Sequence, residues 1–455
     1  MQTNNNNRNL LRYIKFLTND QIADIEVTNK QSVLSHIHKL DIFISSLIKL
    51  YILTLSFLSR IIFFRSFWNL KQPQISFLIK LIFIFNLLIK KIDQVLFTIV
   101  NLHFFAKEEM YEIPIKKTTN KDASNHYKFI VIGSGPSASV TASELSKKYN
   151  GDVLIIEKGG NYNVPKSKHP GDEFLKKWYR GGVNTTYFKE MIAYSSGCCF
   201  GGGSEINSGL YHKPDREFLS KWVDEYHTKG LDMNDVSSHI EKVDELTNFE
   251  YSEDDKFLSL LKRKVDKSLK TYSGLNKFYD YNENKKNSMT NTLLTEFLAN
   301  SGKVSLYAEA KNIRYNEKKW EVEVEVKNEK YKYTCDYLFI CSGSIYTNNL
   351  LIKSGIAKDK HKVISKFQFH PMIKMIATYD ESLQEINEDV SSYQDMKYWP
   401  NFIIGNASSS IQFLLSSFQK NIKLRDFISN NWNKMKVFHA TFSLGSGKII
   451  NIPFV

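Results

Sequence analysis

The chain has 455 residues, which is long enough for two or three domains with a hydrophobic core each. Hydrophobic residues make up 42% of it and charged residues 24%, a balance that excludes an intrinsically disordered protein. The formal net charge of +13 favours an anionic partner, although a solvated basic surface explains it too; because no known nucleic-acid-binding module is present, we expect no nucleic acid partner.

The cysteines predict free thiols. Cys198 and Cys199 are adjacent, a spacing that rarely permits a disulfide, and Cys335 and Cys341 form no CxxC pair. No His/Cys cluster has zinc spacing, so we expect no metal site. The N-terminal sequence MQTNNNNRN lacks the apolar core of a secretory signal. These features favour a cytoplasmic protein, with a peripheral membrane contact left open by the region that follows.

Residues 1–124 predict a helical, apolar and basic extension. The longest charge-free run within residues 41–106 has 13 residues, short of the ~18–20 that a spanning helix needs. A span over residues 72–89 would bury Lys80, at a cost of ~3 kcal/mol. We therefore expect amphipathic helices. They either pack on the rest of the protein or form a peripheral membrane contact through residues 41–106.

A dinucleotide-binding loop follows this extension. The Val- and Ile-rich segment 128–132 predicts a buried strand. It leads into Gly133-Ser134-Gly135-Pro136-Ser137-Ala138, the GxGxxA form of the loop. Gly133 permits the tight turn, Gly135 lets the backbone approach a pyrophosphate, and Pro136 suits the first turn of a helix. The N-terminus of that helix offers N–H groups and a positive dipole end to the phosphates.

A second apolar strand, residues 153–156, ends at Glu157, 24 positions after Gly133. An acidic side chain there accepts hydrogen bonds from a ribose diol in dinucleotide-binding folds. The order of strand, loop, helix, strand and carboxylate predicts a dinucleotide site. Further along, residues 225–286 are polar and predict helices, and strands are expected over residues 304–306, 320–326 and 337–341.

The later motifs narrow the choice of family. The segment Cys199-Phe200-Gly201-Gly202-Gly203-Ser204-Glu205-Ile206-Asn207 resembles the GGxSxxN segment of the glucose–methanol–choline (GMC) oxidoreductases. The blocks 288–298 and 337–356 are similar to two further segments of that family, in the same order. The resemblance covers residues 127–380. It implies an α/β fold: an FAD-binding Rossmann-like domain, a discontinuous α+β substrate domain and, outside the resemblance, the added N-terminal helices.

The same resemblance implies a role for each matching residue. Gly133, Ser134, Gly135 and Pro136 would hold the FAD pyrophosphate, and Glu157 the adenosine ribose. Gly202, Gly203, Ser204 and Asn207 would lie near the isoalloxazine and ribityl chain. Gly343 and Ser344 would approach the adenosine, and the backbone of Asn312 or Ile313 would meet the adenine. The expected domain boundaries are 1–124 for the extension, 125–224 and 287–360 for the FAD-binding domain, 225–286 for a helical insertion or substrate-domain part, and 361–455 for the substrate domain.

The activity implied is oxidation of the CH–OH group of a small alcohol, by hydride transfer to flavin N5 with a histidine as acid–base. His439, in the late segment 437–447, is the candidate for that histidine. Family members usually continue beyond the position that matches Val455, so we expect the usual C-terminal segment to be missing and name no second catalytic residue. The alternatives are a truncated, non-catalytic flavin-binding or membrane-attached remnant, and another FAD-linked oxidoreductase. The sequence names no electron acceptor.

Overall fold

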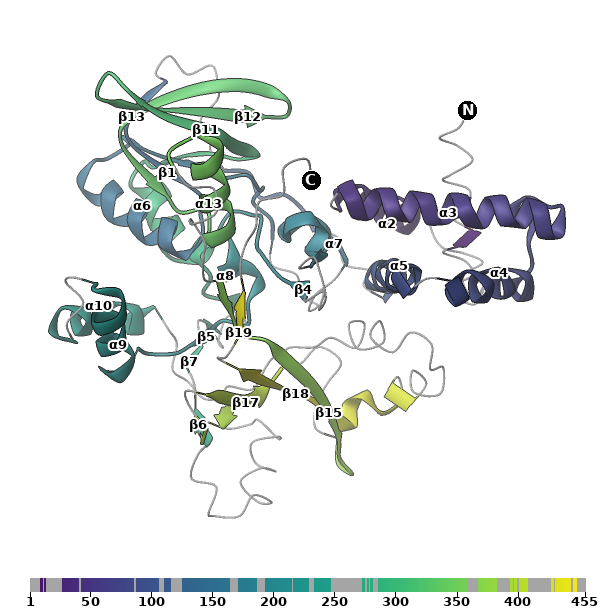
Figure 1. The fold of residues 1–455 in the computed structure, drawn as a ribbon. Coiled ribbons are helices and arrows are strands. Elements are labelled where there is room, and N and C mark those ends of the chain that lie inside the picture. The colour runs from purple at the N-terminus through teal and green to yellow at the C-terminus, as the bar shows by residue number, and fades with distance from the viewer. Residues whose placement is uncertain are drawn as a thin grey trace.

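The structure is a computed structural model of the chain. It describes residues 9–10, 12–13, 27–40, 42–85, 87–105, 110–115, 125–163, 171–185, 193–214, 216–228, 233–246, 272–274, 276–277, 279–280, 285–357, 367–382, 393–395, 397–398, 401–407, 427–428, 430–442 and 445–447. These residues form a group of N-terminal helices, a six-stranded sheet with helices on its faces, and a second, five-stranded sheet (Figure 1).

The N-terminal helical unit confirms the helices expected there. It consists of α2 (Val27–Lys39), α3 (Ile42–Phe63), α4 (Gln72–Phe85) and α5 (Leu87–Phe105), with a 3-10 turn, η1 (Phe67–Asn69). One face of each long helix packs into a common apolar core that includes Leu55, Leu78 and Ile99. Within it the hydroxyls of Tyr13 and Tyr51 are hydrogen-bonded at 3.0 Å. The unit therefore has a core of its own.

The six-stranded sheet has the order β10-β2-β1-β13-β12-β11. Its strands are β1 (His126–Ile132), β2 (Val153–Ile156), β10 (Lys303–Ser305), β11 (Ala308–Asn316), β12 (Lys319–Val326) and β13 (Glu329–Ile340). β10, β2, β1 and the second half of β13 pair in parallel, and β13, β12 and β11 form an antiparallel meander. The long β13 belongs to both parts, so it joins the meander to the parallel sheet.

Helices cover both faces of this sheet, as the Rossmann-like fold class requires. α6 (Pro136–Lys148) and α12 (Leu293–Ala299) pack on the face that carries Phe129 and Val131. α13 (Ser344–Lys353) lies on the opposite face, where Leu350 packs among the side chains of Ile130 and Ile132. Side chains alternate along β1, so one strand serves both cores.

The second sheet is antiparallel, in the order β15-β18-β17-β16-β6. It contains β15 (Met372–Thr378), β18 (Met435–Phe442), β17 (Phe402–Asn406), β16 (Tyr393–Asp395) and β6 (Tyr272–Gly274). The last strand corrects the helical expectation for residues 225–286. Among the described residues there, the end of α9 (Arg216–Tyr226) and α10 (Met233–Glu245) are helical, and β6, β7 (Asn276–Lys277), β8 (Tyr279–Asp280) and β9 (Lys285–Lys286) follow. Strands of two or three residues leave no alternation for sequence analysis to detect.

The remaining described elements are short and lie mostly between the larger units. They are α7 (Gly171–Lys177), η2 (Tyr179–Gly182), β3 (Asn184–Thr185), β4 (Ala193–Tyr194), α8 (Gly203–Ile206), β5 (Leu210–Tyr211), α9 (Arg216–Tyr226), η3 (Met289–Asn291), β14 (Phe367–Phe369), η4 (Trp432–Lys434) and β19 (Gly445–Gly447). α7 and η2 contact α2, and α7 also contacts α5, so they connect the N-terminal helical unit to the rest of the protein (Figure 1).

Two buried histidines carry this connection. His36 of α2 and His103 of α5 are joined at 2.7 Å between Nδ1 and Nε2, and the His36 Nε2 lies 2.6 Å from the carbonyl oxygen of Gly181 in η2. A carbonyl oxygen only accepts, so His36 carries its proton on Nε2 and accepts from His103 on Nδ1. Gly181 leaves room for the ring, because a Cβ there would lie 2.4 Å from it.

Candidate dinucleotide-binding site

The carboxyl ends of three neighbouring parallel strands meet at one edge of the six-stranded sheet. Ile132 ends β1 in register with Ile156 of β2 on one side and Ile340 of β13 on the other. Gly133 follows β1, donates its N–H to the Ile156 carbonyl oxygen at 2.8 Å, and has a φ of +100°. The loop after β1 here crosses the loop after β13. A Cβ at Gly133 would lie 2.5 Å from the Cys341 carbonyl oxygen, so only glycine fits at this crossing.

The first helix after the crossing begins at the predicted place. Gly135 is the N-cap of α6 and Pro136 its first residue, and among the described residues no side chain caps the N–H groups of this turn. Pro136 has no N–H to leave unsatisfied. The uncapped N–H groups and the positive end of the helix dipole form an anion site at the position expected for the pyrophosphate.

A second glycine loop lies against the first. Gly201 and Gly202 both have positive φ, +92° and +57°. A Cβ on Gly202 would lie 2.7 Å from the Cα of Gly135, so the two backbones touch. A Cβ on Gly203 would meet nothing within 4 Å. The structure thus brings the two predicted glycine motifs, 67 positions apart along the chain, into direct contact.

Ser134 and Glu157 form the polar link between these loops. The Ser134 hydroxyl donates to Glu157 Oε2 at 2.6 Å and accepts from the Gly201 N–H at 3.1 Å. The other carboxylate oxygen, Oε1, accepts from the Gly159 N–H at 2.7 Å. Burial raises the pKa of Glu157, and these hydrogen bonds partly oppose that effect. A backbone hydrogen bond from Ser134 adds to these two, so three of the four acceptor positions of the carboxylate are occupied and one is left for a ribose hydroxyl.

The loop after β13 closes the same edge of the sheet. The Cys341 N–H donates to the Ile132 carbonyl oxygen at 2.8 Å, which places this loop beside Gly133. Gly343 is the N-cap of α13, has a φ of +83°, and would meet nothing within 4 Å with an added Cβ. Ser344 follows it, and both residues are exposed. The two predicted adenosine-side residues therefore lie at an open position next to the crossing.

Three other predicted residues make contacts within the protein. The Ser204 hydroxyl donates to the Gly201 carbonyl oxygen at 2.7 Å and accepts from the Met289 N–H at 3.1 Å, so it ties the glycine loop to η3. Asn207 is exposed, and its Oδ1 accepts from the Gly209 N–H at 3.0 Å. The Ile313 N–H donates to the Ser354 hydroxyl at 2.9 Å, which occupies that backbone donor.

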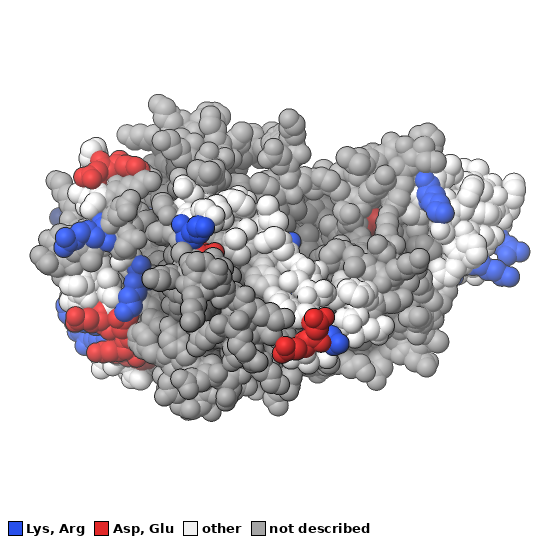
Figure 2. All heavy atoms as spheres, turned by 90° about the horizontal axis from the view of Figure 1, so that it is seen from below, with Lys and Arg blue, Asp and Glu red and all other residues white. Residues whose placement is uncertain are grey.

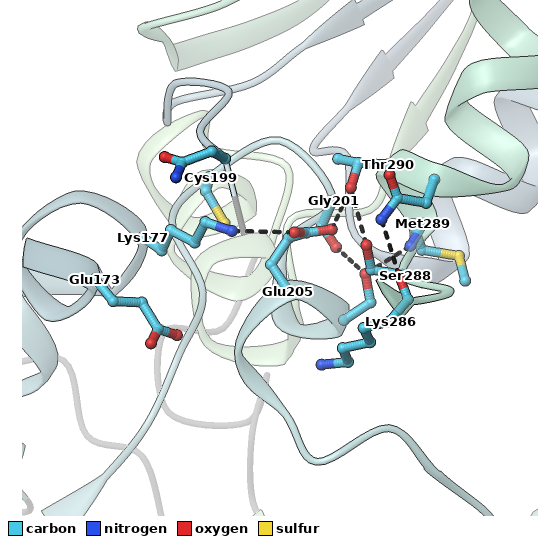
Figure 3. A network of polar contacts seen from close by, with 12 residues as sticks. Glu173, Lys177, Cys199, Gly201, Glu205, Lys286, Ser288, Met289 and Thr290 are labelled. Atoms are coloured by element: carbon cyan, nitrogen blue, oxygen red, sulfur yellow. Dashed lines mark hydrogen bonds and ion pairs between the residues drawn. The ribbon is translucent and has the colours of Figure 1, made fainter. Parts of the chain in front are cut away.

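A buried ion pair supports the second glycine loop, and sequence analysis missed it. Lys177 Nζ lies 3.2 Å from Glu205 Oε2, and the two side chains are 1% and 3% exposed (Figure 3). The Thr290 hydroxyl donates to Glu205 Oε1 at 2.6 Å. A Cβ on Gly201 would lie 2.6 Å from that same Oε1, so the loop folds closely over the carboxylate.

The two partners differ in how well the sequence signals them. Glu205 stands two positions after the glycine run, a place where an acidic residue can be noticed, but Lys177 comes from the charged helix α7, where lysines are ordinary surface residues. Only the three-dimensional structure brings the amino group into the interior. A buried charge requires its partner, so the pair fixes α7, α8 and η3 relative to one another.

His439, the candidate acid–base, lies in the second sheet. It is in the middle of β18, opposite Lys374 of β15 and Gly405 of β17, and is 6% exposed. A Cβ on Gly405 would come 3.1 Å from the His439 ring, so the ring packs over that glycine. His370, between β14 and β15, is exposed. The four cysteines, all described, are free thiols, as expected.

Comparison with known proteins agrees with this arrangement. The family model of the GMC oxidoreductases matches residues 127–372, more than half of the chain. The chain belongs to the GMC oxidoreductase family. The match includes both glycine loops, Glu157 and the loop after β13, so the residues that meet at the crossing are those of the family's cofactor domain. The cofactor is FAD.

Individual relatives are distant. The chain is 24% identical over 276 residues to the GMC-type oxidoreductase y4nJ of Sinorhizobium fredii, which covers 55% of this chain and 53% of that protein. It is 27% identical over 128 residues to pyranose dehydrogenase 3 of Leucoagaricus meleagris, covering 27% and 21%. The chain thus spans about half the length of the y4nJ protein. The crystal structure of pyridoxine 4-oxidase from Mesorbium loti has a similar fold, with a TM-score of 0.52, 11% identity, and 71% and 73% of the two chains covered.

The described residues fit FAD. The uncapped start of α6 suits the two phosphates, and the remaining acceptor position on Glu157 suits a ribose hydroxyl. At Gly133 and Gly202 a side chain would collide with neighbouring backbone. When bound, FAD supplies a two-electron acceptor, which no side chain provides. The protein provides the shape of the site, its hydrogen bonds and the exclusion of water.

Proposed function

We propose that this protein oxidises the CH–OH group of a small organic alcohol to a carbonyl, with FAD as the hydride acceptor. The contact of the Gly133–Gly135 loop with the Gly201–Gly203 loop carries the proposal, because it builds a cofactor site of a redox family from two distant segments. In the reaction the substrate carbon gives up a hydride and its hydroxyl gives up a proton. The chain's own task is therefore to hold the alcohol and to accept that proton.

For the proton we propose His439 as the base. It lies on β18, the strand next to β15 in the second sheet, and we assign that sheet to the substrate domain that the family resemblance implies. A histidine suits the task, because the ordinary pKa of an imidazole lies near neutral pH. The name of pyranose dehydrogenase 3 supports a polyhydroxylated substrate as the first class to test.

The test of the proposed reaction is an anaerobic half-reaction. The full chain, loaded with FAD, is mixed with a panel of sugars, primary aliphatic alcohols and aromatic alcohols, and the flavin absorbance is followed. We expect one class to bleach the oxidised flavin, with one carbonyl product formed per flavin. Flavin that stays oxidised with every donor, in a protein that binds FAD, would contradict the proposed reaction.

The role of His439 is tested separately. We expect His439→Asn to lower the rate of flavin reduction about a hundredfold or more, within the range for loss of a general base. His370→Asn, at an exposed histidine just before β15, is the matched control. A His439→Asn protein that unfolds more easily but reduces its flavin at the normal rate would assign this histidine to packing over Gly405.

A further inference from the structure

An apolar stripe runs along the outer face of α3. Its members recur at helical spacing and are exposed: Ile42, Leu50, Leu53, Phe57, Ile61 and Phe64, the last just beyond the helix end. Phe57 is 65% exposed and Phe64 is 90% exposed. Phe77 of α4 is also exposed, and its ring centroid lies 6.2 Å from that of Phe63 at the end of α3. Soluble proteins rarely expose so many large apolar side chains together unless the surface binds something.

The charge around this stripe has one sign. Residues 42–85 contain no aspartate or glutamate, and every basic residue among them is exposed: Lys49, Arg60, Arg65, Lys71 and Lys80. Lys49 and Arg60 lie on one flank of the α3 stripe at helical spacing. Seen from below, the end of the unit where α3 turns into α4 shows basic side chains among uncharged atoms (Figure 2). An apolar face with a basic rim matches an anionic lipid surface, whose headgroups attract the cations.

We propose that α3 binds the surface of an anionic membrane through this stripe, with its axis parallel to the bilayer. The proposal concerns the N-terminal helical unit and does not depend on the proposed reaction. The segment Ile44–Phe63 is long and apolar enough to span a bilayer, with 20 residues and a mean hydropathy of 1.7. Two features of α3 favour the parallel orientation.

The first feature is the opposite face of the helix. Ile48, Tyr51 and Leu55 are buried in the core that α3 shares with the other N-terminal helices, and the Tyr51 hydroxyl is bonded to that of Tyr13. A spanning α3 would have to leave this core and break that hydrogen bond inside lipid. The second feature is the position of Lys49 and Arg60 within the helix, where a span would carry both cations into the hydrocarbon. Lying flat, α3 keeps its core and leaves both cations at the headgroups.

The test is flotation of the full, FAD-loaded chain with vesicles of phosphatidylcholine alone or of phosphatidylcholine with phosphatidylglycerol. We expect binding to the anionic vesicles, weaker binding at high salt, and release of the bound protein by alkaline carbonate. Phe57→Ser should weaken binding about tenfold, because one large side chain no longer enters the interface. Lys49→Gln with Arg60→Gln should weaken it about fivefold per charge removed.

Matched controls lie on the β11–β12 hairpin. Tyr315→Ser removes an aromatic ring that is 61% exposed, and Lys318→Gln with Lys319→Gln removes two exposed cations. These variants should bind as the parent does. Equal binding of Phe57→Ser and Tyr315→Ser, or no preference for anionic vesicles, would overturn the proposal. Retention of the protein on the vesicles after the carbonate wash would indicate a spanning helix and would also overturn the proposal. A dimer that forms without lipid and that Phe57→Ser converts to a monomer would overturn it too, because a second copy of the chain would then cover the stripe.

Discussion

At the scale of single residues, the site depends on where side chains are absent. Gly202 touches Gly135, and the added Cβ of an alanine would lie 2.7 Å from the Gly135 Cα, with a backbone φ of +57°. Neither backbone can move without disturbing the start of α6. We expect Gly202→Ala to weaken FAD binding about tenfold or more, since overpacking of this kind costs ~1–3 kcal/mol. Titration of the apoprotein with FAD, followed by flavin fluorescence, measures the change.

The control for Gly202→Ala separates the contact from the backbone strain. Gly355 also has a positive φ, +71°, but an added Cβ there would meet nothing within 4 Å. Gly355→Ala should therefore lose some stability and keep the parental FAD affinity. Normal FAD affinity in Gly202→Ala would show that the two loops separate without cost, and that their contact does not shape the site.

The buried pair Lys177–Glu205 gives a second prediction at this scale. We expect Lys177→Met to lower the free energy of unfolding by ~3–5 kcal/mol, because Glu205 would keep a buried charge without its partner. Thermal and urea denaturation of the FAD-loaded protein measure the loss. The matched control is Lys147→Met, whose ion pair with Glu144 is largely exposed and should contribute less than ~1 kcal/mol. Equal losses in the two variants would contradict the structural role given to the buried pair.

The sequence constrains the glycines of the site more tightly than its polar residues. A GxGxxA loop after a strand leaves few alternatives, because its positive φ and close contacts exclude other residue types. Ser204 carries no such constraint in the sequence, and its hydroxyl holds the loop to η3. The Lys177–Glu205 contact spans 28 positions and two different helices. A contact between helices depends on how those helices pack, which no local pattern records.

At the scale of elements, the junction between the N-terminal helical unit and η2 depends on pH. Burial lowers the pKa of His36 to about 3 and that of His103 to about 4. The charge of His103 lowers the His36 pKa further, as does Lys39, whereas the bond to Gly181 and the charge of Asp172 raise it. Both imidazoles are therefore neutral in the folded protein, whereas the unfolded chain takes up protons below about pH 6.5.

The direction in which stability changes with pH follows from that difference. Stability from the pair is complete above about pH 6.5 and is lost as the pH falls towards 4, by a few kcal/mol in total, on the order that the lowered pKa values imply. We expect His36→Gln to lower the melting temperature at pH 7.5 and to flatten its decline between pH 6.5 and 4.5. His38→Gln, at an exposed histidine of the same helix, should change neither. An unchanged pH profile in His36→Gln would contradict the junction described here.

The success of sequence analysis also varied from element to element. The strand over residues 153–156 was predicted to the residue, since a buried parallel strand is a continuous apolar run bounded by polar residues. The helical expectation for residues 225–286 was wrong at β6, because three residues of a sheet edge depend on their partner strand β16 and not on their own pattern. Lys49 and Arg60 interrupt the apolar run of α3, so the sequence did not predict it as one continuous helix of 22 residues.

At the scale of the whole molecule, the cofactor site and the apolar stripe belong to different units. The FAD site lies at the edge of the six-stranded sheet, and the stripe lies on α3 in the N-terminal helical unit (Figure 1). His36, His103 and Gly181 connect the two through η2. This separation means that lipid binding and flavin binding can be measured independently, and that a variant of one should leave the other unchanged.

The account depends most on the claim that the two glycine loops together bind FAD. Its most direct measurement is the flavin content of the purified full chain after incubation with FAD and gel filtration, read from the visible absorbance. We predict one FAD per chain, with the absorbance bands of a bound oxidised flavin, and a content reduced in Gly202→Ala. A folded chain that leaves the column without flavin would contradict the account.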